Sequence, residues 1–133
     1  MAQLRQTVGS LRDSPLVPIT LREMVEGVAG IDVELVRSDV TYRDDVEATI
    51  LAITREALTN VVRHSGATRA IVTVADSPDG VAVDIVDNGA VSDDPVEGNG
   101  IRGMRERAES LGGRLDARRG PSGGFAVSAR LPT

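Results

Sequence analysis

Two runs of β-branched residues, 70–75 and 81–86, constrain the fold of this chain more than any other feature. The residues between them read Asp-Ser-Pro-Asp-Gly, a composition that favours a turn. The pattern predicts an antiparallel hairpin. Runs 114–118 and 125–131 flank a Gly-rich segment and predict a second strand pair. The alternating run 31–38 adds one strand, so we expect about five strands, most of them antiparallel.

Other segments show the helical spacing of apolar residues instead. Residues 20–30 open with the Thr-x-x-Glu pattern of a capping box, 44–65 form the longest stretch, and 101–111 precede two glycines. Residues 3–12 have an apolar stripe too narrow for an independent helix. Together these patterns indicate an α+β fold, a two-layer sandwich with one mixed sheet and about three helices on one face.

The composition supports a single domain and excludes several chemistries. The 133 residues are 41% hydrophobic but include one Phe, one Tyr and no Trp, so the core must be aliphatic. With no Cys, disulfides, thiol nucleophiles and thiolate metal sites are excluded. A single His excludes multi-histidine metal sites. The net charge of -5, without a basic cluster, disfavours nucleic acid as a partner.

Nothing in the sequence predicts membrane contact. No apolar run reaches the roughly 18–20 residues that a membrane span requires, and the first residues lack the apolar stretch of a signal peptide. We therefore expect a cytoplasmic location, with the cytoplasmic part of a membrane-bound protein as the alternative. Pro15 and Pro18 predict an extended connector after residues 3–12, so the domain itself is expected to occupy residues 20–133.

Glu56, Asn60 and Arg63 lie at i, i+4 and i+7 of the longest helical stretch. At about 100° per residue, the three side chains fall within roughly 60° of one another. A carboxylate and an amide oxygen suit a hard cation, and a guanidinium suits the phosphates that such a cation neutralises. The same spacing also fits a solvated helix surface. His64, the single histidine, is by itself typical of a helix C-terminus, where it interacts with the dipole.

Asp87-Asn88-Gly89 ends a predicted strand. An ionised carboxylate only accepts hydrogen bonds, so Asp87 could bind the exocyclic amine of adenine and would repel the carbonyl of guanine. The same three residues also favour a simple Asx turn. Taken alone, the turn is the better interpretation.

Residues 98–103 fit G-x-G-x-x-G at the start of a predicted helix. A dinucleotide site would need a strand directly before the motif and an acidic residue about 20 positions later. Residues 90–97 form an acidic loop instead and the region near 120 is Gly-rich, so we exclude a dinucleotide-binding fold. Phosphate binding at this helix N-terminus stays open, since glycines let backbone N–H groups approach an anion. Ile101 and Met104 follow at core spacing, although Met104 could also wall a pocket.

In this order, the motifs resemble the ATP-binding domain of sensor histidine kinases, which belongs to the GHKL group of ATPases with a Bergerat-type fold. Segment 55–65 resembles the N box of that family, in particular the form seen in nitrate-sensor kinases. Segment 87–89 resembles its first glycine box and segment 98–107 its second. The resemblance covers about residues 20–132, nearly the whole chain.

The resemblance implies roles for individual residues. Asn60 would coordinate Mg²⁺, Glu56 would help to organise the metal and the γ-phosphate, and Asp87 would receive the adenine amine. In total it implies ATP contacts at Asn60, Arg63, His64, Asp87, Gly89, Gly98, Gly100, Ile101, Gly103 and Met104.

The activity implied by the resemblance is transfer of the γ-phosphoryl group of ATP to a histidine on a separate dimerisation domain upstream. The implied partners are that domain, in a homodimeric full-length protein, and a response regulator. Residues 1–19 would be the end of the dimerisation helix and its connector. A stand-alone serine kinase that binds a sigma factor and a non-catalytic nucleotide-sensing module are alternatives.

Two departures from the family pattern favour the sensing alternative. Val91 stands where the family often has a second glycine. Phe125 stands where Thr is common, so this side chain lacks the hydroxyl that would make a polar contact beside the adenine.

Overall fold

The computed structural model describes residues 20–90, 98–121 and 123–133. The predicted helix at 3–12, its connector, Val91 and the acidic residues of the loop after Gly89 lie outside the described residues. In chain order the described elements are α1 (Leu21–Glu26), β1 (Asp32–Arg37), α2 (Asp44–Asn60), the π-helical turn η1 (Val61–Ser65), β2 (Arg69–Ser77), β3 (Gly80–Asp87), α3 (Asn99–Ser110), β4 (Arg114–Arg119) and β5 (Phe125–Pro132).

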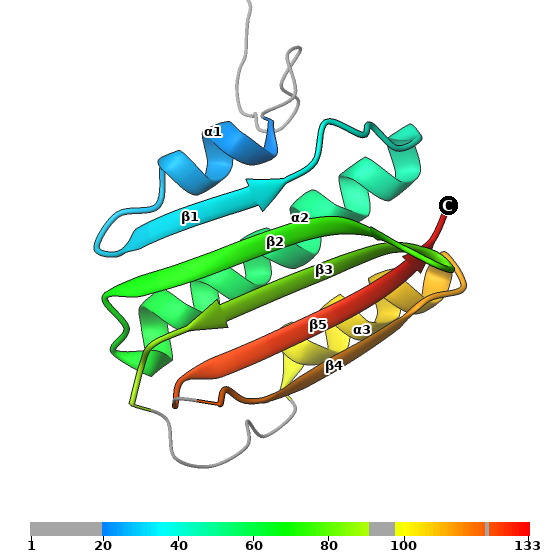
Figure 1. Ribbon diagram of the computed structural model, residues 1–133. Coiled ribbons are helices and arrows are strands. Elements are labelled where there is room, and N and C mark those ends of the chain that lie inside the picture. Colours follow the sequence, from blue (N-terminus) through cyan, green and yellow to red (C-terminus); the bar gives the residue numbers. More distant parts are fainter. Residues whose placement is uncertain (1–19, 91–97, 122) are drawn as a thin grey trace, which may run out of the picture.

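Within the described ranges, five strands form one sheet in the order β1-β2-β3-β5-β4. β1 pairs with β2 in parallel, and the other neighbouring pairs are antiparallel. Figure 1 shows α1, α2 and α3 together on one face of this sheet. The predicted α+β class, with a mixed and mostly antiparallel sheet, is therefore confirmed. In this part of the chain no helix is long and apolar enough to cross a membrane.

α1 begins with the predicted capping box. The Thr20 hydroxyl accepts a hydrogen bond from the Glu23 N–H at 3.1 Å, and the Glu23 carboxylate accepts one from the Thr20 N–H at 2.9 Å. The second bond lowers the pKa of Glu23, because a carboxylate that accepts an N–H is stabilised in its charged form. The helix ends at Glu26 with Gly27 as its C-cap, earlier than the predicted end near Gly30.

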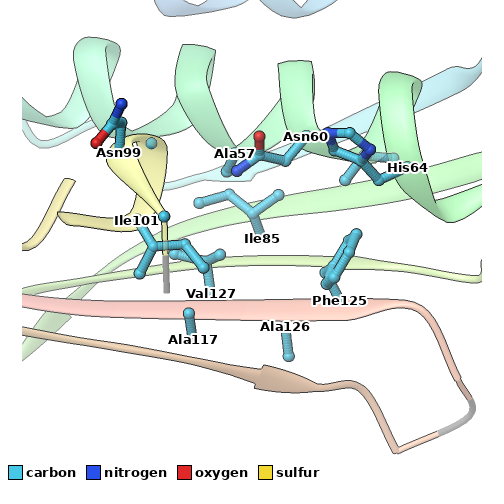
Figure 2. A pocket seen from close by; sticks show the side chains of 13 residues that line it. Ala57, Asn60, His64, Ile85, Asn99, Ile101, Ala117, Phe125, Ala126 and Val127 are labelled. Carbon is cyan, nitrogen blue, oxygen red and sulfur yellow. The ribbon is translucent and has the colours of Figure 1, made fainter. Parts of the chain in front are cut away.

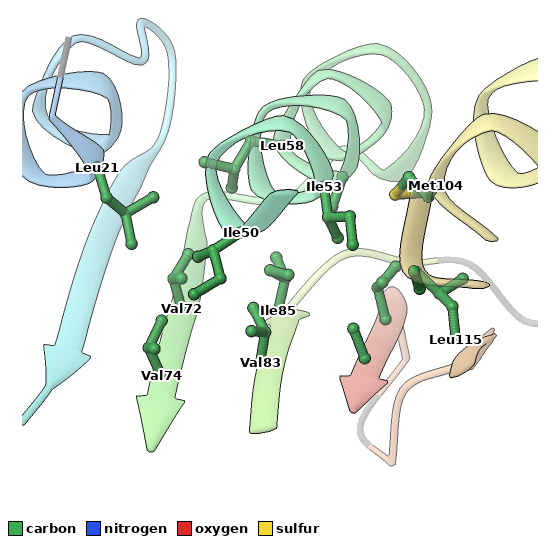
Figure 3. Close-up of a cluster of buried hydrophobic side chains, with 14 of the residues drawn as sticks. Leu21, Ile50, Ile53, Leu58, Val72, Val74, Val83, Ile85, Met104 and Leu115 are labelled. Atoms are coloured by element: carbon green, nitrogen blue, oxygen red, sulfur yellow. The ribbon is translucent and has the colours of Figure 1, made fainter. Parts of the chain in front are cut away.

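The core fills the space between the helices and the sheet, and it is aliphatic as predicted. Figure 3 shows its side chains pointing toward one another from both layers. Side chains that are at most 2% exposed include Ile50, Ile53 and Leu58 of α2, Val72 and Val74 of β2, Val83 and Ile85 of β3, and Met104 of α3. Burial of each such side chain stabilises the fold by about 1.5–3 kcal/mol, which fixes α2 and α3 over the central strands.

Tyr42, the single tyrosine, lies between β1 and α2. Its hydroxyl donates to the Asp76 carboxylate in β2, and Glu47 of α2 accepts its backbone N–H at 2.8 Å. The Arg37 guanidinium lies 5.9 Å from the ring centroid and pairs with Glu47 at 2.5 Å. Burial, then the hydrogen bond to Asp76 and its charge, raise the pKa of Tyr42 to about 12.

A titration of phenolate absorbance therefore reports on Tyr42 alone. Its folded pKa lies above the ordinary value of 10.0, so its contribution to stability is complete below pH 10 and is lost as the pH rises toward about 12. We expect a native midpoint near 12 and a lower midpoint in Asp76→Asn, which removes the neighbouring charge. Asp79→Asn, in the exposed turn, is the control and should leave the midpoint unchanged. A native midpoint at the ordinary value would contradict the arrangement.

Candidate functional site

The C-terminal end of α2 departs from the regular helix that the sequence predicts. After Asn60 the chain continues as the π-helical turn η1 and stops at Gly66, whose φ of 66° is left-handed. A π turn is wider and rotates less per residue than an α turn, so the spacing of 100° per residue no longer holds beyond Asn60. Both Arg63 and His64 are exposed, and of the two His64 lines the cavity described below whereas Arg63 does not.

A cavity of about 370 Å³ lies between this helix and the sheet, and Figure 2 shows its walls. Its volume is in the range of small-molecule sites, and most of its surface is apolar. Three groups of residues line it: Ala57, Asn60, Val61 and His64 from α2 and η1; Ile85, Ala117, Phe125, Ala126 and Val127 from the sheet; and Gly98, Asn99, Gly100 and Ile101 from the start of α3.

The N-terminus of α3 meets Glu56 and Asn60 of α2 at one edge of this cavity. A Cβ atom added to Gly100 would lie 2.6 Å from Glu56 Oε2 and 3.6 Å from Asn60 Nδ2. Glycine at this position therefore allows the close approach. Gly98 is the N-cap and makes no side-chain cap, so the first-turn N–H groups need acceptors from elsewhere. An anion is a suitable acceptor, because the helix dipole adds to these donors.

The same two side chains form a donor set that suits Mg²⁺. The half-buried Glu56 carboxylate and the side-chain amide of Asn60 converge at Gly100, and Mg²⁺ usually takes one or two protein ligands while phosphates and water complete its shell. No cluster of three His, Cys, Asp or Glu side chains that could hold a metal occurs in the described part of the chain. The arrangement therefore fits a cation that arrives with a phosphorylated ligand.

Asp87 ends β3 as a buried carboxylate, 4% exposed. Its Oδ1 accepts the Gly89 N–H at 2.7 Å and its Oδ2 accepts the Phe125 N–H at 2.9 Å. The bond to Gly89 is an Asx turn, so the simple interpretation of this motif is confirmed. Each carboxylate oxygen keeps a second lone pair for a ligand. Asp87 does not line the cavity, but its partner Phe125 does.

Asn88, the residue after Asp87, has a structural role. Its side-chain oxygen accepts the N–H groups of Thr68 and Arg69, both at 3.0 Å, and its amide donates to the Thr68 hydroxyl. These bonds join the end of β3 to the start of β2. Asn88 therefore holds the strand end in place while Asp87 faces the interior.

The predicted site residues divide into three groups in the structure. Asn60, His64, Gly98, Gly100 and Ile101 line the cavity. Glu56 and Asp87 lie next to its walls, through contacts with Gly100 and Phe125, and Gly89 lies one step further away, in contact with Asp87 and Ser65. Arg63 is exposed, Gly103 is half-buried without lining the cavity, and Met104 is part of the core, as its spacing predicted.

The sequence did not single out several of the residues that line the cavity. Ala57, Ile85, Ala117 and Val127 occupy inward positions of helix and strand, where their spacing is the same as that of the core. Asn99 lies between Gly98 and Gly100, and its place in this glycine motif is the one feature of the sequence that could have indicated a site residue.

A cavity with an open helix N-terminus, a carboxylate and an amide side chain beside it, and a buried carboxylate nearby fits the nucleotide-binding class of domains. No protein-family model matches the chain. It is 31% identical to the sensor histidine kinase YxjM of Bacillus subtilis over 99% of its own length, and 33% identical to the nitrate/nitrite sensor NarQ of Escherichia coli over 95%. These matches span 34% and 24% of the two relatives, so the chain covers about a third of their length or less.

The solved structures agree with these relatives. The ATP-binding domain of PrrB from Mycobacterium tuberculosis superposes with a TM-score of 0.67 at 26% identity, covering 84% of this chain and 87% of that one. The chain belongs to the sensor histidine kinases and has the fold of their ATP-binding domain, as its motifs predicted.

The contact between Gly124 and Asp87 gives a test of the site geometry. A Cβ atom at Gly124 would lie 2.1 Å from Asp87 Oδ1, and the φ of 73° is left-handed. Gly66 has a similar φ of 66° but open space around it, so Gly66→Ala measures the backbone strain alone, about 1–2 kcal/mol. We expect Gly124→Ala to lose clearly more free energy of unfolding than Gly66→Ala, as measured by urea denaturation. Equal losses in the two variants would contradict the packing of Asp87 against β5.

Proposed function

We propose that this domain binds ATP with Mg²⁺ and transfers the γ-phosphoryl group to a histidine on a dimerisation domain of the same protein. The observation that carries the proposal is the convergence of Glu56, Asn60 and the start of α3 at Gly100, at the edge of an apolar cavity. The names of YxjM and of the PrrB domain support the kinase class and the ATP ligand.

The base of ATP would occupy the apolar cavity, with Asp87 at its edge. The remaining lone pairs of Asp87 would accept the adenine amine, and His64 would lie beside the nucleotide. The phosphates would lie at the N-terminus of α3, near Gly98 and Gly100, where first-turn N–H groups are available. Arg63, exposed on η1, would contact the phosphates from the other side.

Glu56 and Asn60 would hold Mg²⁺ between them and the phosphates. When bound, the metal would neutralise phosphate charge, which is its usual contribution to phosphoryl transfer. The residues of this chain position the γ-phosphate and stabilise the developing charge through backbone N–H groups. His64 is the only histidine and belongs to the cavity wall, so the phosphoacceptor would be supplied by another domain.

The wider setting of the domain follows from the same proposal. The full-length protein would be a homodimer through its upstream helices, residues 1–19 would include the end of that helix, and 20–133 would be the kinase domain. A response regulator would receive the phosphoryl group, and the domain would work in the cytoplasm. The 33% identity to NarQ supports a nitrate-sensor-like subfamily.

Calorimetric titration with ATP and Mg²⁺ tests nucleotide binding. We expect measurable binding to the wild type and at least about tenfold weaker binding for Asp87→Asn, because a hydrogen bond to a charged acceptor is lost. Asp84→Asn is the matched control, since Asp84 lies on the same strand but bonds to Ser128 and Arg130, outside the cavity. Thermal melts of both variants check folding. No binding to the wild type, or equal affinity in Asp87→Asn, would overturn the site assignment.

Incubation of labelled ATP with the domain and its upstream helical domain tests phosphoryl transfer. We expect acid-labile phosphohistidine on the helical domain and its loss, by about a hundredfold or more, in Asn60→Ala, because the metal ligand is removed. Thr59→Ala, next to it on α2, is the control, since its hydroxyl bonds only within the helix. ATP binding without any phosphohistidine would leave the nucleotide-sensing module as the function.

A further inference from the structure

The chain around Phe125 is fixed by its contact with Asp87. Gly123 and Gly124 both have positive φ, 95° and 73°, so the backbone turns sharply into β5. The turn brings β5 so close to β3 that a Cβ at Gly124 would lie 2.1 Å from Asp87 Oδ1. The next N–H, that of Phe125, donates to Asp87 Oδ2 at 2.9 Å. Asp87 and Phe125 are therefore held in fixed positions relative to each other.

The Phe125 side chain points into the cavity. Figure 2 shows its ring rising from β5 toward the helix layer, at the end of the cavity where His64 lies. Val127, two residues further along β5, lines the same cavity. The ring is half-buried and does not belong to the aliphatic core cluster, so part of its surface is open to a ligand. This is the only Phe in a chain without Trp.

We propose that Phe125 is the residue that holds the purine ring by stacking, while its neighbour Asp87 reads the exocyclic amine; this rests on the proposed ATP site. Asp87 already accepts two backbone N–H groups, and because an ionised carboxylate only accepts hydrogen bonds, its remaining lone pairs can bind the base only through the amine. A flat aromatic ring contacts the π-face that every base has, whatever its substituents. Phe125 thus supplies affinity for the base and Asp87 recognises its amine. With the stacking contact in place, the hydroxyl that is common at position 125 in the family is not needed.

Two nucleotides separate these roles: ATP, and the triphosphate of unsubstituted purine riboside, which lacks the amine. We expect Phe125→Leu, which keeps an apolar side chain of similar length but removes the π-face, to weaken binding of both by a similar factor, between about fivefold and a hundredfold. Asp87→Asn should weaken ATP binding by a clearly larger factor than binding of the analogue, because any shift of Phe125 affects both nucleotides whereas only ATP loses the contact to its amine. Ile71→Ala, an exposed apolar residue of β2 outside the cavity, is the control and should bind both as the wild type does.

Phe125→Trp adds a second measurement, because it introduces the only Trp of the chain. Its emission should change when ATP or the purine analogue binds and should not change with tripolyphosphate, which has no base. Circular dichroism of each variant checks that the fold is retained. If ATP binds the wild type but Phe125→Leu binds it equally well and the Trp emission does not respond, the stacking role is overturned and the ATP site stands. If the wild type binds neither nucleotide, both proposals are overturned.

Discussion

The Asp87 carboxylate is the interaction on which the rest of the site depends. It accepts N–H groups from Gly89, in the turn after β3, and from Phe125, the first residue of β5. The same turn reaches η1, because the Ala90 N–H donates to the Ser65 carbonyl at 2.9 Å. A buried carboxylate would be costly without such partners, so its burial and the positions of these three segments support one another.

Much of the fold could be predicted from local chemistry. The β-branched runs, the turn residues between them and the capping box act within a few residues, so the elements and the α+β class follow from the sequence. Boundaries differ by a few residues, and β2 and β3 extend to Ser77 and Gly80, inside the predicted turn. At these ends, pairing with neighbouring strands outweighs the turn preference of single residues.

The site was harder to predict, because its geometry depends on contacts between distant segments. Nothing in the sequence Val-Val-Arg-His-Ser marks a π turn, and the spacing groups Arg63 with Glu56 and Asn60, whereas in the structure His64 lines the cavity and Arg63 does not. For Asp87 the two sequence interpretations are compatible, since one oxygen makes the Asx turn and both keep a lone pair. Phe125 stood out only as a departure from the family pattern, and its place in the cavity became evident from the pairing of β5 with β3.

The glycines of the site act through close approach more than through flexibility. A Cβ at Gly89 would lie 2.3 Å from the Ser65 carbonyl, one at Gly100 would lie 2.6 Å from Glu56 Oε2, and one at Gly124 would lie 2.1 Å from Asp87 Oδ1. Each glycine is thus the point where one wall of the site touches another, whereas Gly98 and Gly103 have open space around them. These contacts hold α2, η1, α3, β3 and β5 close together around the cavity. Since the net charge of -5 would repel a triphosphate, the proposed nucleotide site depends on this local geometry for its affinity.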